Sequence, residues 1–130
     1  MAAIAGIDIA LWDLKGKAAG LPVWRLLGGE NRPLFTYATG GYYRPGATDG
    51  DYGEELARFL DLGYRAVKLK TGAGSVAAEA ERVGAVRKAL GDAPDLLLDM
   101  NAPYDLPDCI EFAHRVEPHR IFWLEEPLHW

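Results

Sequence analysis

Hydrophobic residues near the start of the chain recur at intervals of three and four positions, with charged residues between them. They are Ile4, Ile7, Leu11 and Leu14. This period predicts an amphipathic helix, and Gly20 with Pro22 is expected to end it. Residues 23–27 predict a second, short helix that stops at Gly28.

After a polar stretch at residues 30–33, which indicates a domain boundary, short apolar runs alternate with helical patterns. The runs predict strands at residues 34–39, 64–70, 96–101 and 121–125. The helices predicted between them run from Asp51 to Gly63, from Ser75 to Gly91 and from Leu106 to Val116, with Asp51 and Glu54 capping the first. This alternation predicts a parallel α/β sheet, in either a doubly wound open sheet or a (β/α)8 barrel.

Composition excludes several classes of function. The chain has 130 residues, of which 49% are hydrophobic, and a formal net charge of −5. Because it is acidic and has no Lys/Arg cluster, nucleic acid is not an expected partner. No apolar run reaches the roughly 20 residues of a membrane span, so no membrane association is predicted and a cytoplasmic location is expected. Cys109 is the only cysteine, which excludes a disulfide framework.

Charged and amide side chains stand at the ends of three predicted strands. Lys68 and Lys70 end the second strand, Asp99 and Asn101 follow the third, and Glu125 ends the fourth. The carboxyl ends of parallel strands meet at one edge of the sheet, where α/β proteins carry their chemistry. These side chains are therefore expected to converge.

The converging side chains suit a divalent metal with a basic group beside it. Asp99, Asn101 and Glu125 offer hard oxygen ligands of the kind that Mg²⁺ or Mn²⁺ prefers. A nearby cation and partial burial both lower the pKa of a lysine, and such a lysine can act as a general base. Glu126, next to Glu125, is expected to point to the opposite face and to pack against the helices or form a salt bridge there.

Each motif also has an ordinary structural explanation when it is taken alone. Lys-x-Lys is common on solvated strands, Asp-x-Asn often forms a turn, and Glu-Glu-Pro is a common polar exit from a strand. A purely structural explanation needs all three at successive strand ends by coincidence. The catalytic interpretation needs a single site.

Three ordered motifs resemble the mandelate racemase and muconate lactonizing enzyme group of the enolase superfamily. Residues 3–17, continuing through residues 22–26, are similar to the family's N-terminal signature helix. Residues 99–101, Cys109, Val116 and residues 124–127 are similar to its second signature, with the family's spacing. The Lys-x-Lys pair falls in register with both. The resemblance covers essentially the whole chain.

The resemblance implies both a fold and a chemistry. Residues 34–130 would form the first half of a (β/α)8 barrel, about four βα units, and residues 1–33 the last helices of a preceding α+β capping domain. The enzyme would need Mg²⁺, with Mn²⁺ as an alternative. It would abstract the proton α to a carboxylate and stabilise the enediolate that results.

Individual roles follow from the same resemblance. Asp99 and Glu125 would be metal ligands, Lys70 the catalytic base, and Lys68 a second catalytic residue that assists with the substrate carboxylate. A third acidic ligand and a second acid/base are expected beyond Trp130. The chain is therefore expected to be a fragment that is inactive alone.

The expected substrate is a small carboxylate, bound by Asn101, Tyr42, Tyr43 and His129. Acid-sugar dehydration is the expected reaction, with racemisation or cycloisomerisation as alternatives. An alternative of another class is a non-catalytic α/β module that binds or assembles with a partner. The intact relative is expected to be a homo-oligomer. A half barrel has unpaired strand edges and an exposed apolar face, so it is expected to self-associate or need a complementing half.

Overall fold

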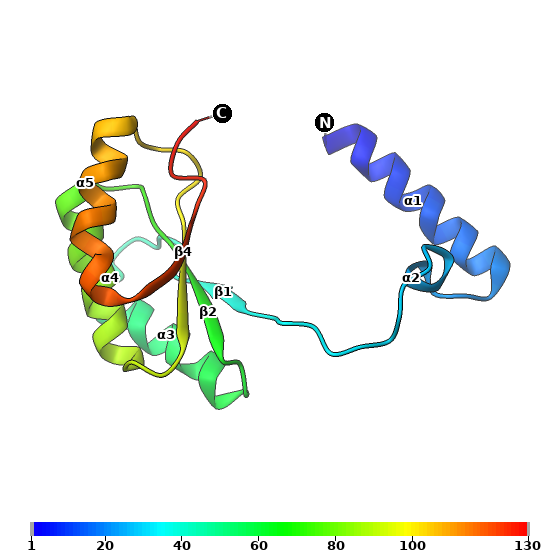
Figure 1. Cartoon of the computed structure of the whole chain (residues 1–130), viewed down its shortest axis with the longest axis horizontal. Coiled ribbons are helices and arrows are strands. Elements are labelled where there is room, and N and C mark those ends of the chain that lie inside the picture. Colours follow the sequence, from blue (N-terminus) through cyan, green and yellow to red (C-terminus); the bar gives the residue numbers. More distant parts are fainter. Residues whose placement is uncertain (1, 130) are drawn as a thin grey trace. The chain divides into compact units, whose positions relative to one another are not determined.

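A computed structural model of the protein describes residues 2–129. The chain divides between Phe35 and Thr36 into two compact units (Figure 1). The polar stretch at residues 30–33 lies just before this division. Along the described chain, no helix is both long and apolar enough to cross a lipid bilayer.

The first unit consists of α1 (Ala2–Ala19) and the single-turn helix α2 (Val23–Leu26). Gly20, with a φ of 63°, ends α1 as its sequence predicts. Gly16 lets the chain turn back closely, because a Cβ there would lie 2.9 Å from the carbonyl oxygen of Leu21. The large apolar side chains of α1 are 55–72% exposed, namely Ile4, Ile7, Ile9, Leu11 and Leu14.

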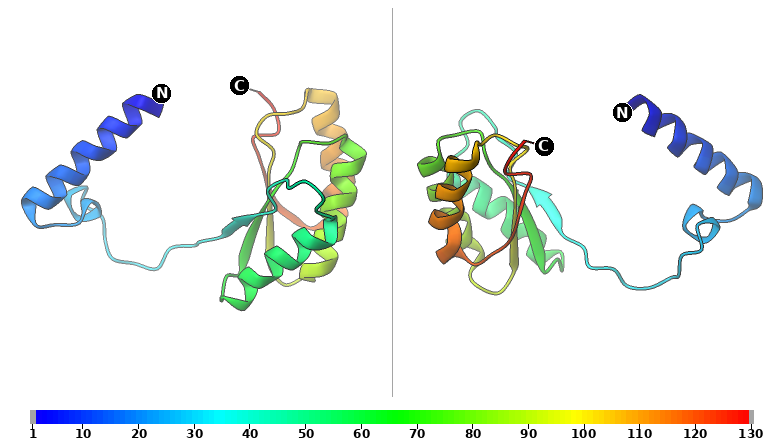
Figure 2. Two further views of the ribbon diagram at one scale, coloured as in Figure 1. Left: turned by 180° about the vertical axis from the view of Figure 1, so that it is seen from behind. Right: turned by 45° about the horizontal axis from the view of Figure 1, so that its top comes forward.

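The second unit is a parallel sheet in which each strand pairs with the next along the chain. Its strands are β1 (Ala38–Gly40), β2 (Ala66–Lys70), β3 (Asp95–Asp99) and β4 (Ile121–Glu125). Its helices are α3 (Asp49–Asp61), α4 (Val76–Leu90) and α5 (Leu106–Val116), followed by the short 3₁₀ helix η1 (Glu117–His119). All three α-helices lie on one face of the sheet (Figures 1 and 2). This sequential, one-sided winding is that of a partial (β/α)8 barrel, because a doubly wound sheet has helices on both faces.

The hydrophobic core fills the layer between sheet and helices. From the strands it takes Val67, Leu69, Leu96 and Leu98, all 0% exposed. From the helices it takes Leu56, Val83, Val86 and Phe112, also 0% exposed. Cys109 is half-buried and packs against this core.

Several predicted element boundaries differ from the structure. Strand β2 begins at Ala66 instead of residue 64, and β3 ends at Asp99 instead of residue 101. The first strand is only Ala38–Gly40, and residues 34–37 lie outside it despite their apolar character. Helix α3 begins earlier than predicted, because Thr48 is its N-cap. The Thr48 hydroxyl and the Asp51 carboxylate form a reciprocal capping box, so Asp51 is the N3 residue and not the cap.

Candidate active site

The strand register brings the predicted charged residues together at the carboxyl edge of the sheet. Lys70 on β2 lies opposite Asp99 on β3, and Asp99 lies opposite Glu125 on β4. Lys68 is two residues back along β2, so its side chain points to the same face as that of Lys70. The long lysine chain carries its ammonium up to the carboxylates.

The contacts between lysines and carboxylates are short. Lys70 Nζ donates to Asp99 Oδ2 at 2.5 Å and to Asn101 Oδ1 at 2.9 Å. Lys68 Nζ donates to both carboxylate oxygens of Glu125 at 3.0 Å and lies 3.2 Å from Asp99 Oδ2. We call Lys68, Lys70, Asp99, Asn101 and Glu125 the strand-end cluster.

Burial and neighbouring charges shift the pKa values of Asp99 and Lys68 in opposite directions. Asp99 is 3% exposed and Lys68 8%. Burial favours the neutral form of Asp99, but hydrogen bonds from Lys70 and Lys68 outweigh it and hold the pKa of Asp99 below its usual value. Burial likewise disfavours the ammonium of Lys68, yet hydrogen bonds to Glu125 and Asp99 outweigh it and raise its pKa. The direction at Lys68 is opposite to that expected of a lysine beside a cation, because two carboxylates surround it here.

One oxygen of the cluster fits a metal ligand. Asp99 Oδ1 is buried and has no hydrogen-bond partner among the described residues. A buried carboxylate oxygen without a partner is energetically costly unless a cation binds it. The neighbouring side-chain oxygens of Glu125 and Asn101 are also hard ligand atoms. Residues 2–129 contain no group of three His, Cys, Asp or Glu side chains that could share a metal. The strand-end cluster contains two carboxylates, those of Asp99 and Glu125.

Glu126 does not lie where strand alternation predicts. It follows β4 with a φ of 46°, a left-handed conformation that interrupts the alternation. Its side chain is exposed, and its Oε2 accepts a hydrogen bond from Asn101 Nδ2 at 3.3 Å. The expectation that Glu126 packs against the helices is therefore wrong, and its contact orients the Asn101 amide.

The adjacent tyrosines after β1 have different partners. The Lys70 ammonium lies 5.8 Å from the centre of the Tyr42 ring, so Tyr42 stands beside the cluster. The Tyr43 hydroxyl donates to Glu79 Oε2 at 2.8 Å and accepts from the backbone N–H of Ala73 at 3.1 Å. Tyr43 thus joins the β1–α3 loop to α4, and its substrate role stays a prediction.

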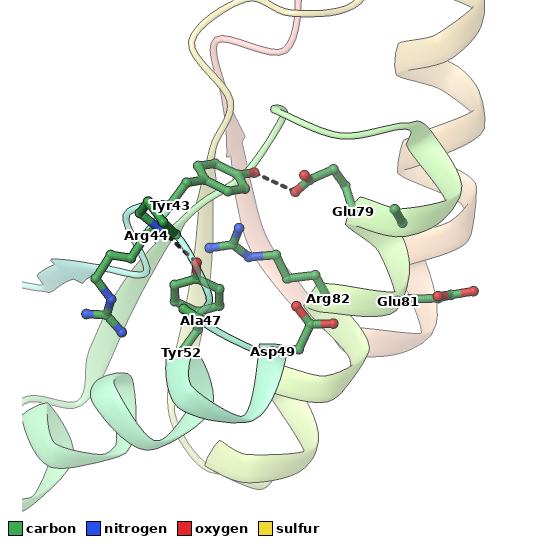
Figure 3. Close-up of a pocket in the computed structure, with 10 residues that line it drawn as sticks. Tyr43, Arg44, Ala47, Asp49, Tyr52, Glu79, Glu81 and Arg82 are labelled. Atoms are coloured by element: carbon green, nitrogen blue, oxygen red, sulfur yellow. Dashed lines mark hydrogen bonds between the residues drawn. The ribbon is translucent and has the colours of Figure 1, made fainter.

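Tyr43 lines a separate pocket of about 630 Å³ between the β1–α3 loop and α4 (Figure 3). The Arg82 guanidinium lies 4.0 Å from the centres of the Tyr43 and Tyr52 rings and donates to the carbonyl oxygen of Gly41. From the other side, Glu55 Oε1 accepts from the Gly41 N–H at 3.1 Å. Gly41 is therefore held by two helices, one residue before Tyr42.

Sequence reasoning missed the buried pair Glu79 and Arg82, which are 3% and 4% exposed. A signal for them was present, because both fall on the same helical stripe as the core residues Val83 and Val86. Charged residues on a buried stripe need specific partners, and here the partners are Tyr43 and Gly41. The exposed residue His129 ends the described part of the chain, and its substrate role stays a prediction.

Parallel βα units with lysines and carboxylates at the carboxyl edge are the arrangement in which (β/α)8-barrel enzymes carry their active sites. Residues 51–130 match the family described as enolase C-terminal domain-like. Residues 1–28 match the N-terminal domain of mandelate racemase / muconate lactonizing enzyme. The chain therefore belongs to the mandelate racemase / muconate lactonizing enzyme family of the enolase superfamily.

Its relatives include dehydratases, cycloisomerases and racemases. Arabinonate dehydratase from Saccharolobus solfataricus is 36% identical, over 98% of this chain and 34% of its own length. The crystal structure of the 3,6-anhydro-D-galactonate cycloisomerase from Zobellia galactanivorans is 40% identical with a TM-score of 0.86, covering 98% of this chain and 35% of that one. A racemase from Streptomyces coelicolor with bound magnesium is 37% identical with a TM-score of 0.84, covering 98% and 37%. The chain spans about a third of the length of these relatives.

Proposed function

We propose that the strand-end cluster is part of the catalytic centre of a metal-dependent enzyme that removes the proton α to a carboxylate. The observation that carries this proposal is the buried, unpartnered Oδ1 of Asp99 beside two lysines and a second carboxylate. Residues 1–33 would belong to its capping domain and residues 34–130 to its barrel. The match of residues 1–28 to the family's N-terminal domain supports this division.

In this proposal Asp99 and Glu125 hold Mg²⁺, with Mn²⁺ as an alternative. The magnesium bound to the Streptomyces coelicolor racemase supports the choice of metal. When bound, Mg²⁺ would supply the positive charge that stabilises negative charge developing on the substrate carboxylate. Asp99 Oδ1 has no hydrogen-bond partner among the described residues. A metal could therefore bind this oxygen without breaking a hydrogen bond.

Lys70 is the proposed base. In its neutral amine form, Lys70 Nζ takes the α-proton and becomes an ammonium as the substrate C–H bond breaks, and the bonding electrons stay with the substrate. Its hydrogen bonds to Asp99 and Asn101 fix the direction of Nζ. Lys68 and Asn101 orient the substrate carboxylate, and Tyr42, beside Lys70, forms part of the wall. His129 is a further proposed substrate contact.

The proposed reaction is dehydration of an acid sugar, in which proton removal is followed by loss of the β-hydroxyl as water, with the proton for this leaving group coming from a general acid. The dehydratase relative, 36% identical over 98% of this chain, supports this choice. Racemisation or cycloisomerisation would use the same first step, since relatives of both kinds share this part of the fold. A small carboxylate is the substrate class common to these reactions.

Calorimetric titration of the 130-residue chain with Mg²⁺ tests the proposal. Asp99→Asn is expected to weaken binding at least about tenfold, because one charged ligand is lost. Asp95→Asn, a matched change at the other end of β3, is expected to leave binding unchanged. Equal Mg²⁺ binding by the wild type and Asp99→Asn would overturn the assignment.

A further inference from the structure

The ammonium of Lys68 lies between the two proposed metal ligands. Its Nζ is 3.0 Å from each carboxylate oxygen of Glu125 and 3.2 Å from Asp99 Oδ2. It is the only described lysine that contacts both carboxylates, since Lys70 contacts Asp99 and Asn101. Lys68 thus makes the bridge between β3 and β4 that a bound cation would make.

The fold fixes the position of the Lys68 side chain. The residue is 8% exposed and lies in the middle of β2, where the neighbouring strands fix its direction. Its ammonium also lies 5.2 Å from the centre of the Tyr37 ring, which offers a cation a second favourable contact. The ammonium therefore keeps one favourable contact, with the Tyr37 ring, if the carboxylates bind another cation.

From this geometry we infer that Lys68 is an internal counter-ion that competes with the divalent metal for Asp99 and Glu125. The inference rests on the proposed function, which places the metal at these carboxylates. Before the metal enters, the ammonium holds two like charges together that would otherwise repel one another. When the metal binds, Lys68 gives up contacts with the carboxylates, and its donors become available to a substrate carboxylate.

The direction in which Mg²⁺ affinity changes when Lys68 loses its charge shows whether the lysine competes with the metal. Removing the Lys68 charge leaves both carboxylates with one fewer competing cation, so the chain should bind Mg²⁺ more tightly. If Lys68 only supported the fold, Mg²⁺ affinity would not change. If it preorganised the ligands without competing, affinity would fall.

Calorimetric titration with Mg²⁺ of the wild type, Lys68→Met and Lys88→Met tests this inference. Lys68→Met keeps the length and apolar stem of the side chain and is expected to bind about tenfold more tightly, an order-of-magnitude figure for one adjacent charge. Lys88→Met removes the same charge from an exposed position on α4 and is expected to bind like the wild type. Unchanged or weaker binding by Lys68→Met would overturn the inference.

Thermal melting with and without Mg²⁺ keeps the test decisive if Lys68→Met folds poorly. Its melting temperature should be lower than that of the wild type without Mg²⁺ and should rise more on adding it. Lys68→Gln, which keeps a donor without the charge, should behave in the same direction. Failure of both variants to fold even with Mg²⁺ would also overturn the inference. Equal Mg²⁺ binding by the wild type and Asp99→Asn would instead count against the proposed function. Failure of the inference on Lys68 can therefore be told apart from failure of the proposed function.

Discussion

The rings of Tyr37 and Trp123 meet edge to face with their centroids 5.6 Å apart, although they lie at opposite edges of the sheet. Tyr37 directly precedes β1, and Trp123 lies on β4. Trp123 is in register with Leu97, which is 0% exposed although it is outside the helix-facing core. The sheet is therefore curved enough for a side chain just before its first strand to meet one on its last strand across the concave face.

Replacing Trp123 with alanine should destabilise the second unit. The change removes the Tyr37 contact and exposes Leu97, and we expect a loss of about 3 kcal/mol in the free energy of unfolding. Urea denaturation followed by circular dichroism would measure it. Phe122→Ala is the control: its ring is 54% exposed and lies 5.4 Å from that of Trp123, so this change removes one ring contact of Trp123 but keeps the Tyr37 contact, and it should cost less than about 1 kcal/mol. Equal losses for the two variants would show that the ring contact contributes little.

Tyr43→Phe should destabilise the protein, whereas Tyr42→Phe should not. The Tyr43 hydroxyl binds Glu79 and the Ala73 N–H, so its removal leaves a buried carboxylate short of a donor and should cost about 1–2 kcal/mol. Tyr42 is 57% exposed, and its change should lie within about 0.5 kcal/mol of the wild type. Chemical denaturation of both variants checks the pair. The reverse order would contradict the loop-anchoring role of Tyr43.

Asp99 should make stability depend on pH in acid. Its pKa is held below the ordinary value by Lys70 and Lys68, against burial, so the folded state favours the carboxylate. That contribution is complete above the unfolded pKa, about 3.9, and is lost as the pH falls through the lower folded pKa. The free energy of unfolding of the wild type should therefore fall more steeply below about pH 4 than that of Asp99→Asn. Parallel slopes would contradict this linkage.

Tyr104 should make stability depend on pH in alkali. Burial, with the charges of Glu79 and Asp108, raises its pKa from 10.0 to about 12. Between these values the unfolded chain releases the proton and the folded protein retains it, so stability falls as the pH rises. Tyr104→Phe should reduce this alkaline loss. At neutral pH it should be neutral or stabilising by about 1 kcal/mol, because the hydroxyl is buried and finds no partner within residues 2–129.

The 130-residue chain alone should show negligible turnover. The described residues supply two carboxylates to the strand-end cluster and do not complete a group of three His, Cys, Asp or Glu side chains there. Incubation with acid sugars and Mg²⁺ in D₂O, followed by proton NMR, should show no incorporation of deuterium at the α-carbon. Metal-dependent exchange by the purified chain would refute this expectation. Size-exclusion chromatography of the same sample tests the expected self-association.

Much of the barrel half and of its site was predictable because both depend on local patterns. The runs before Lys70, Asp99 and Glu125 are continuous and apolar, and parallel pairing places their ends at one edge. The first strand was predicted less well, since residues 34–37 are apolar but lie outside the paired strand, which begins at Ala38. Hydrophobicity alone does not encode pairing.

The different contacts of Tyr42 and Tyr43 could not be predicted from the sequence. The two residues are adjacent and chemically identical, and their roles are separated by Glu79 and Arg82, far along the chain. The position of Glu126 was missed for another reason. Its left-handed backbone breaks the alternation on which the prediction depended.

Gly41 limits how the mouth of this site can be redesigned. Its backbone is held by Glu55 and Arg82, its φ is 71°, and a Cβ there would collide with the side chain of Leu69. Substrate range in such enzymes is most easily altered by exchanging loop residues, and Tyr42 is open to that change. The position before it accepts only a hydrogen atom as its side chain. Libraries that vary this loop should begin at residue 42.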